Sequence, residues 1–162
     1  IKRVIGLPGD KVRLIKGKLF INESMLIREE LSDFVEKKIE QGSMKTVPQC
    51  VNEPVPFGNE NCIKYQSLEK LDNGKSYKIL DLGQNIGDDT QDFIIGDNEY
   101  FFLGDNRDNS LDSRFDRQFG GVGLVSKEYL IGKASLILFS SRGSSIFYFW
   151  TWRKDRFFKV IR

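Results

Sequence analysis

The fold class follows from residues 1–22, which read IKRVIGLPGDKVRLIKGKLFIN. Apolar residues alternate there with basic ones, and patterning of period two is typical of half-buried β-strands. Two turn signals, Leu7-Pro8-Gly9-Asp10 and Lys16-Gly17, interrupt the alternation. The stretch therefore predicts a β-meander, whose three strands cover Lys2 to Ile5, Lys11 to Ile15 and Lys18 to Asn22.

More strands are expected further along the chain. Residues 64–71 and 75–82 flank Asp72-Asn73-Gly74, and Asn-Gly between two strand-like runs is the strongest short signal for a β-hairpin. Residues 83–92 predict a loop. Three further strands are expected at Phe93 to Ile95, Tyr100 to Leu103 and Ala134 to Ser140, the last being a continuous apolar run typical of a buried strand.

One segment departs from the β pattern. Apolar residues between Ser24 and Gln41 recur at helical spacing, with Ser24 as N-cap and Gly42 as stop signal, so a helix is expected. Overall the sequence predicts a mainly β fold with little helix. Its expected parts are a β-sheet core of residues 1–23 and 93–145, an inserted smaller β-rich lobe of residues 24–92 with the hairpin at 64–82, and a C-terminal segment of residues 146–162.

Length and charge narrow the class of protein. A chain of 162 residues suffices for one core and a small lobe. Its formal net charge of +2 is too small to indicate a nucleic-acid binder, so no nucleic-acid partner is expected. Histidine is absent, which excludes Ser-His-Asp and Cys-His catalytic sets and metal sites built on imidazole. A hydrolase with this sequence must use another base, and no metal or cofactor is expected.

Cys50 and Cys62 are the only cysteines, and they lie in a stretch rich in Pro, Asn and Glu. The chain offers no further cysteine or histidine ligand for a structural zinc. Two alternatives stay open at this point. The cysteines form a disulfide if the protein lies outside the cytoplasm, or they are two free thiols.

The C-terminal segment differs in composition from the rest. Residues 146–162 hold seven of the aromatic residues, including both tryptophans, and five basic residues against one acidic residue. Aromatic rings beside cations suit a membrane interface, but a terminal strand and helix packed on the core would have the same composition. No apolar run is long enough for a membrane-spanning helix, and no secretory signal pattern is present.

The polar run Gly104-Asp105-Asn106-Arg107-Asp108-Asn109-Ser110-Leu111-Asp112-Ser113-Arg114 has the composition of a solvated loop. It directly follows the predicted strand Tyr100 to Leu103, and polar loops held by a rigid strand often carry site residues. Composition alone leaves both interpretations open.

Two boxes together carry a resemblance to a known family. The run Lys2-Arg3-Val4-Ile5-Gly6-Leu7-Pro8-Gly9-Asp10-Lys11-Val12 and the polar run of residues 104–114 resemble, in the same order, two motifs of bacterial type I signal (leader) peptidase. The resemblance implies a mainly β, membrane-anchored serine protease with a Ser/Lys dyad. Such an enzyme removes signal peptides from exported preproteins after small residues, in an Ala-x-Ala-like context, on the outer face of the bacterial cytoplasmic membrane. Signal peptides and the membrane surface are then the expected partners.

The resemblance also implies roles for individual residues. Lys2 matches the general base, and Ser110 matches the serine that orients it. An unperturbed lysine has a pKa near 10.4, so a lysine that serves as a base must be desolvated among apolar groups. Gly104 matches a position where a side chain would crowd the lysine. The other residues expected to support the site are Arg3, Asp105, Asn109, Asp112 and Arg114, with Asp112 paired to Arg114 and Asp105 to Arg3.

The family's nucleophile lies in a Ser-Met-x-Pro box upstream of the lysine, and neither this box nor the membrane anchor is present in the sequence. The run Ser43 to Pro48 resembles the box only superficially, because it lies downstream of the lysine and has three residues between methionine and proline. The chain is therefore expected to be a fragment that does not cleave by itself. Two other interpretations stay open, namely a non-catalytic β-rich module that binds peptide or membrane, and a self-cleaving switch protein with the same dyad.

Overall fold

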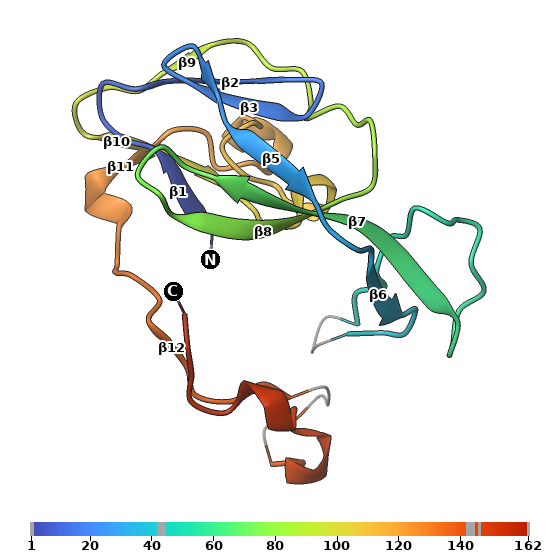
Figure 1. Cartoon of the computed structure of the whole chain (residues 1–162). Helices are drawn as coiled ribbons and strands as arrows, with labels where there is room; N and C mark the ends of the chain where they lie inside the picture. Colours follow the sequence, from blue (N-terminus) through green and yellow to red (C-terminus); the bar gives the residue numbers. More distant parts are fainter. Residues whose placement is uncertain (1, 42–44, 142–144, 146, 162) are drawn as a thin grey trace. The chain divides into compact units, whose positions relative to one another are not determined.

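The computed structural model describes residues 2–41, 45–141, 145 and 147–161 (Figure 1). Ser43 and Met44, and the expected helix stop Gly42, lie outside the described residues. The chain forms two compact units. The first unit comprises Ile1–Val35 and Ile63–Leu130, and the second comprises Glu36–Cys62 and Ile131–Arg162.

The structure is mainly β, which confirms the predicted fold class. The described residues form several antiparallel sheets, and their helical elements are short 3₁₀ turns. The strands are β1 (Arg3–Gly6), β2 (Lys11–Ile15), β3 (Lys18–Ile21), β4 (Ser24–Met25), β5 (Ile27–Glu30), β6 (Phe34–Lys37), β7 (Asn61–Lys70), β8 (Ser76–Asp81), β9 (Phe93–Ile94), β10 (Glu99–Leu103), β11 (Val125–Ser126), β12 (Leu136–Ile137) and β13 (Lys159–Val160). The 3₁₀ helices are η1 (Arg107–Asn109), η2 (Arg117–Phe119), η3 (Lys127–Tyr129), η4 (Phe149–Thr151) and η5 (Lys154–Arg156).

The first unit has one hydrophobic core. Its sheets have the strand orders β1-β10-β11 and β4-β3-β2-β9, and β5 and β8 each pair with the part of β7 that belongs to this unit. The period-two alternation of the β-meander turns one side of each strand inward, as the sequence predicts. The buried side chains of the core are Ile5, Val12, Leu14, Leu19, Leu26, Tyr77, Ile79, Ile95, Phe101 and Leu103.

Two antiparallel strand pairings, β1 with β10 and β7 with β8, bring distant parts of the chain together. Strand β1 pairs antiparallel with β10, with Arg3 opposite Leu103. The predicted hairpin is present as β7 and β8, joined through the turn at residues 71–75, in which the N–H of Leu71 donates to the carbonyl of Lys75. In this hairpin Glu69 lies opposite Tyr77.

The prediction of a helix between Ser24 and Gln41 is wrong. Strands β4, β5 and β6 occupy this stretch, and β5 pairs antiparallel with the long strand β7. Leu26 is buried in the core, whereas Ile27 and Val35, which contributed to the helical spacing, are exposed. The backbone hydrogen bonds that β3 and β7 offer therefore override the local helical pattern.

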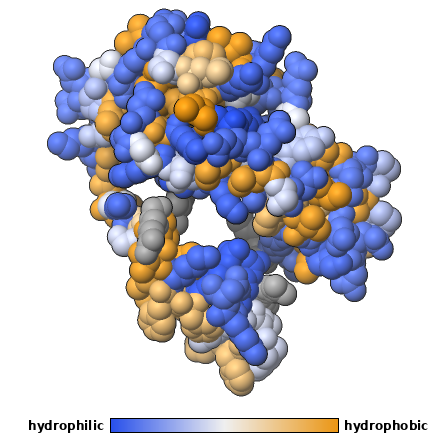
Figure 2. Space-filling view, in the orientation of Figure 1, coloured by the Kyte–Doolittle hydropathy of each residue, from blue (hydrophilic) through white to orange (hydrophobic). Residues whose placement is uncertain are grey.

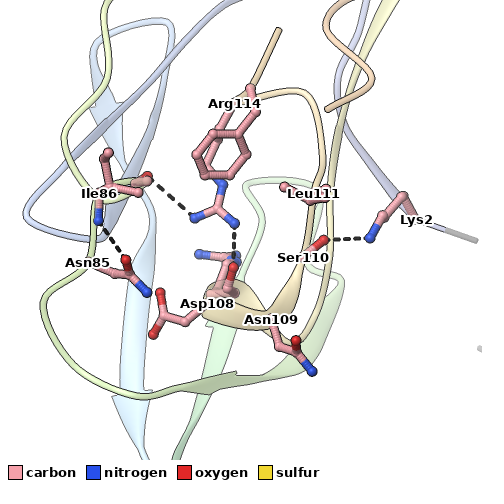
Figure 3. Close-up of a pocket in the computed structure, with 11 residues that line it drawn as sticks. Lys2, Asn85, Ile86, Asp108, Asn109, Ser110, Leu111 and Arg114 are labelled. Atoms are coloured by element: carbon pink, nitrogen blue, oxygen red, sulfur yellow. Dashed lines mark hydrogen bonds between the residues drawn. The ribbon is translucent and has the colours of Figure 1, made fainter. Parts of the chain in front are cut away.

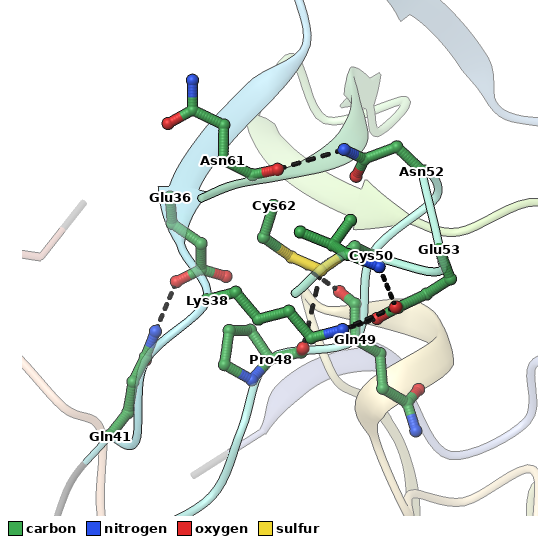
Figure 4. Close-up of a disulfide and its surroundings, with 11 residues drawn as sticks. Glu36, Lys38, Gln41, Pro48, Gln49, Cys50, Asn52, Glu53, Asn61 and Cys62 are labelled. Atoms are coloured by element: carbon green, nitrogen blue, oxygen red, sulfur yellow. Dashed lines mark hydrogen bonds and ion pairs between the residues drawn. A yellow bond between two sulfur atoms is a disulfide. The ribbon is translucent and has the colours of Figure 1, made fainter. Parts of the chain in front are cut away.

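The second unit contains the disulfide, so the oxidised alternative for Cys50 and Cys62 is the one present (Figure 4). The S–S distance is 2.09 Å, and both cysteines are buried. Lys38 forms an ion pair with Glu53 beside the disulfide, at 2.5 Å. The disulfide thus closes the segment that the sequence marks as rich in Pro, Asn and Glu.

The expected buried strand from Ala134 to Ser140 is wrong in length and in burial. Only Leu136–Ile137 form a strand, β12, which pairs with β13. Leu136 and Leu138 are exposed. The apolar run forms only a short and exposed strand, because its partner, β13, is two residues long.

The C-terminal segment exposes aromatic rings. Its backbone forms η4, η5 and β13, and Phe147, Phe149, Trp150 and Phe158 are exposed. Trp152 stacks on Phe139, with ring centroids 4.8 Å apart. Figure 2 shows apolar and hydrophilic surfaces side by side on this segment. In the described part of the chain, no helix has the length and apolar character needed to cross a membrane.

Candidate active site

A lysine and a serine that are far apart in sequence meet in the first unit (Figure 3). Lys2 immediately precedes β1, and Ser110 immediately follows η1. The pairing of β1 with β10 brings these two segments together. The Nζ of Lys2 donates a hydrogen bond to the Oγ of Ser110 at 2.5 Å. Lys2 is half-buried and Ser110 is buried, so the contact is partly shielded from solvent.

Gly104, the first residue after β10, leaves room for this contact. A Cβ on Gly104 would lie 2.5 Å from the Cβ of Ser110, nearer still to its Oγ, and 3.5 Å from the Nζ of Lys2. Real Cβ atoms do not approach other atoms so closely. A glycine is therefore required here for the close approach of Ser110.

Asp112 holds the loop that carries Ser110. Its side chain is completely buried and accepts a hydrogen bond from the N–H of Gly104 at 3.0 Å. The same carboxylate accepts from Nε of Arg114 at 2.9 Å and from Nη2 at 3.0 Å. Arg114 in turn donates to the carbonyl oxygens of Arg107 and Gly87. One buried ion pair thus connects the end of β10, η1 and the loop at Gly87.

Arg3 and Asp105 form a second ion pair beside the lysine. Nε and Nη2 of Arg3 each donate to one carboxylate oxygen of Asp105, both at 2.8 Å. This pair is partly exposed. Because Arg3 lies in β1 and Asp105 directly follows Gly104, the ion pair holds the residue next to Lys2 against the start of the polar loop.

A cavity of about 440 Å³ opens beside the Lys2–Ser110 contact. Asn109, at the end of η1, is exposed and lines the cavity. Apolar groups on its wall come from Ile86, Leu111 and Phe115. The described residues contain no group of three or more His, Cys, Asp and Glu that could hold a metal ion. The site therefore offers an amine, a hydroxyl and a partly apolar recess.

Comparison with known proteins supplies the family. The model of the family described as "Signal peptidase, peptidase S26" matches residues 1–139. The chain belongs to this family. Both boxes of the signal peptidase resemblance lie within the matched residues.

Curated relatives agree with the family match. The chain is 36% identical over 150 residues to a protein named "Signal peptidase I" from Rickettsia typhi, an alignment that covers 88% of this chain and 46% of the relative. A protein of the same name from Rickettsia bellii is 37% identical over 149 residues, covering 88% of this chain and 42% of the relative. The chain thus spans about half the length of the curated relatives it matches.

The structure brings together most of the residues that the signal peptidase resemblance singles out. Lys2, Ser110 and Gly104 are in contact or adjacent, and the two expected ion pairs are formed. Sequence reasoning missed Glu69 on β7 and Tyr77 on β8. No local signal marks them, because the contact of Glu69 with Arg107 and the contact of Tyr77 with Arg3 arise only from long-range pairing.

Replacing Gly104 by alanine is expected to lower the free energy of unfolding of the chain by about 1–3 kcal/mol, because the new methyl group would overlap Ser110. Urea unfolding measures this change. Gly132→Ala is the matched control, since a Cβ there meets nothing within 4 Å. Equal stability of the two variants would contradict the steric role of Gly104.

Asp108, on the wall of the cavity, gives the folded chain a pH-dependent stability. Its Oδ2 accepts the N–H of Leu82 at 2.6 Å. Burial, with a contribution from the charge of Asp81, raises the pKa of Asp108 from an ordinary 3.8 to about 6. The folded chain therefore keeps this proton to higher pH than the unfolded chain. The stability that Asp108 contributes is fully present below its ordinary pKa and is lost as the pH rises through about 6.

We accordingly expect Asp108→Asn to gain stability relative to the wild type as the pH is raised from about 4 to about 7. The asparagine oxygen can still accept the N–H of Leu82, so the substitution mainly removes the titrating proton. Urea unfolding across this pH range measures the difference. Asp116→Asn, at an exposed aspartate of the same unit, is the control, and an equal pH response of both variants would contradict the role of Asp108.

Proposed function

We propose that the complete protein is a serine endopeptidase of the type I signal peptidase class, in which Lys2 is the general base. The observation that carries the proposal is the 2.5 Å hydrogen bond between Nζ of Lys2 and Oγ of Ser110. It supports the proposal because a lysine base must be held in one orientation to accept a proton. Histidine, the commonest base of serine proteases, is absent from the sequence.

In this proposal each residue has a defined task. A serine hydroxyl attacks the scissile carbonyl carbon while its proton passes to the amine of Lys2, and the protonated lysine then gives that proton to the leaving amine. Water hydrolyses the resulting ester. Ser110 orients Lys2, Gly104 leaves room for the pair, and the ion pairs Asp112–Arg114 and Arg3–Asp105 keep the two segments in place. Asn109 is proposed to contact bound peptide, because it lines the cavity.

We assign the nucleophile to a part of the protein that precedes Lys2, because the family carries it in an upstream Ser-Met-x-Pro box. Peptide hydrolysis needs both an attacking oxygen and donors for the developing oxyanion. The isolated chain is therefore proposed to lack turnover. The proposed substrates are exported preproteins, cleaved after small residues in an Ala-x-Ala-like context.

The experiment compares the complete natural protein with the isolated chain on a synthetic signal peptide with an Ala-x-Ala site. Cleavage by the complete protein alone is the expected result. Turnover by the isolated chain that Ser110→Ala abolishes would make Ser110 the nucleophile and overturn the assignment. No cleavage by either protein would favour the non-catalytic module.

The proposed location is the outer face of the cytoplasmic membrane, with the C-terminal segment in contact with lipid. The disulfide between Cys50 and Cys62 supports an oxidising compartment. The exposed rings of Phe147 and Trp150 support the lipid contact, because aromatic rings settle at headgroup depth and nearby cations attract anionic lipid.

The double variant Phe147→Ser, Trp150→Ser is expected to bind vesicles of anionic and zwitterionic phospholipid at least about tenfold more weakly than the wild-type chain, since two rings leave the interface. Co-sedimentation with the vesicles measures the binding. Phe119→Ser, at an exposed phenylalanine of the first unit, is the control. If both variants bind the vesicles as tightly as the wild-type chain does, the proposed contact of the C-terminal segment with lipid is wrong.

A further inference from the structure

Two arginines flank the Lys2–Ser110 contact, and both are held by the same cross-strand pair. Arg3 follows Lys2 in the chain, and Arg107 starts the 3₁₀ helix η1 that leads to Ser110. The cross-strand pair consists of Glu69 on β7 and Tyr77 on β8, which lie opposite each other in the hairpin. All these residues belong to the first unit.

The contact on the Ser110 side is a buried ion pair. The side chains of Arg107 and Glu69 are 2% and 1% exposed. Nη1 of Arg107 donates to Oε1 of Glu69 at 2.9 Å, and Nη2 donates to Oε2. Burial opposes the charge of Arg107, but the facing carboxylate of Glu69 prevails and raises the pKa of Arg107. The two parallel hydrogen bonds form a fork, and this geometry fixes the direction of η1.

Tyr77 contacts both Glu69 and Arg3, the residue that follows Lys2. Its hydroxyl donates to Oε2 of Glu69 at 2.8 Å. Burial raises the pKa of Tyr77, so the hydroxyl keeps the proton that it donates. The guanidinium of Arg3 lies over the Tyr77 ring, 4.2 Å from its centroid, which is within the range of a cation–π interaction. Tyr77 thus contacts the neighbour of Lys2 and the partner of Arg107.

We propose that Glu69 and Tyr77 are positioning residues that set the geometry of the Lys2–Ser110 contact. This inference rests on the proposed function, in which that contact orients the general base. Glu69 holds the backbone that presents Ser110, and Tyr77 holds the strand residue next to Lys2. A backbone hydrogen bond also connects the hairpin with the polar loop. The N–H of Leu80 on β8 donates to the carbonyl of Asp105 at 2.8 Å.

The alternative is that Glu69 only stabilises the fold. A buried ion pair is weak support for stability, because the cost of removing two charges from water offsets most of their attraction. A displacement of about 1 Å at a reacting group, in contrast, can cost about 10²-fold in rate. The two roles are therefore separated by a readout at Lys2 itself and by a comparison of kcat with KM.

The first measurement uses the isolated chain, far below its unfolding temperature. Acetic anhydride labels the amine of Lys2, and tandem mass spectrometry compares the rate with that of the exposed Lys18. The test variants are Glu69→Gln and Tyr77→Phe, and Ser110→Ala marks the rate of Lys2 without its partner. Glu29→Gln, at the exposed ion pair between Glu29 and Lys70 on β5 and β7, is the matched control.

In Glu69→Gln, we expect the labelling rate of Lys2 to change in the same direction as in Ser110→Ala, by at least about threefold, while Glu29→Gln leaves it unchanged. Tyr77→Phe removes one hydroxyl and keeps the ring, so a smaller change of the same sign is expected. If Glu69→Gln does not fold, Tyr77→Phe decides. A folded variant with the wild-type labelling rate at Lys2 overturns the proposal.

The second measurement uses the complete protein and the signal peptide substrate. Glu69→Gln is expected to lower kcat by about tenfold to 10²-fold with KM within about twofold. A fall in the unfolding temperature with unchanged kcat would show a purely structural role and overturn the proposal. If the wild-type complete protein does not cleave at all, the proposed function fails, and the labelling of Lys2 alone decides whether Glu69 and Tyr77 position the contact.

Discussion

Lys2→Ala in the complete protein is expected to lower kcat for signal peptide cleavage by roughly 10³-fold, without a comparable change in KM. A positioned general base contributes about 10²- to 10⁴-fold to a proton transfer. Residues 1–162 contain no histidine that could replace the amine, and Ser110 would lose the hydrogen bond that it receives from Nζ. A continuous assay with a quenched fluorescent signal peptide measures kcat and KM separately.

Lys18→Ala is the control for this experiment, because Lys18 is an exposed lysine on β3. The Lys18→Ala variant is expected to have the same kcat as the wild type. If Lys2→Ala retained more than about a tenth of the wild-type kcat, another group would be the base and the assignment of Lys2 would be wrong. Circular dichroism of both variants confirms that they are folded.

Asp112→Ala is expected to lower the free energy of unfolding of the chain by about 3–5 kcal/mol, because it leaves the charge of Arg114 buried without its partner. The lost carboxylate also leaves the N–H of Gly104 without an acceptor. Both side chains of the ion pair are at most 1% exposed, so water cannot easily replace the missing oxygens. Urea unfolding, monitored by circular dichroism, measures the change.

Asp92→Ala is the matched control, since Asp92 forms an exposed ion pair with Lys11 at 2.7 Å. Exposed ion pairs contribute less than about 1 kcal/mol. A loss below about 1 kcal/mol for Asp112→Ala would mean that the loop rearranges and that Arg114 reaches solvent. The inference that Asp112 holds the loop would then be wrong.

Local patterns in the sequence predicted the parts of the fold that depend on neighbouring residues. The alternation from Lys2 to Ile21 and the Asn73-Gly74 turn each act over a few residues, so the strands β1, β2 and β3 and the hairpin were predicted. The polar loop was found because its motif is contiguous. Pairing of Lys2 with Ser110 could be expected only from the family resemblance, since the residues lie 108 positions apart.

The remaining features depend on contacts between distant segments. The helical spacing after Ser24 is real in the sequence, but pairing with β7 determines the structure there. Glu69 could not be singled out, because a glutamate on a strand is usually solvated and only the fold places Arg107 against it. The disulfide was an open alternative, because sequence does not tell the redox state of two cysteines.

The long sequence separation between Lys2 and Ser110 also affects how the protein folds. Strand β1 can pair with β10 only after the intervening residues have been synthesised, and closing such a long loop costs entropy before any contact offsets it. Proteins rich in such distant contacts fold slowly. We therefore expect the lysine and serine to meet late in folding, since a nascent chain that ends before Glu99 has neither β10 nor the serine. Any activity that depends on this contact is delayed until the first unit is nearly complete.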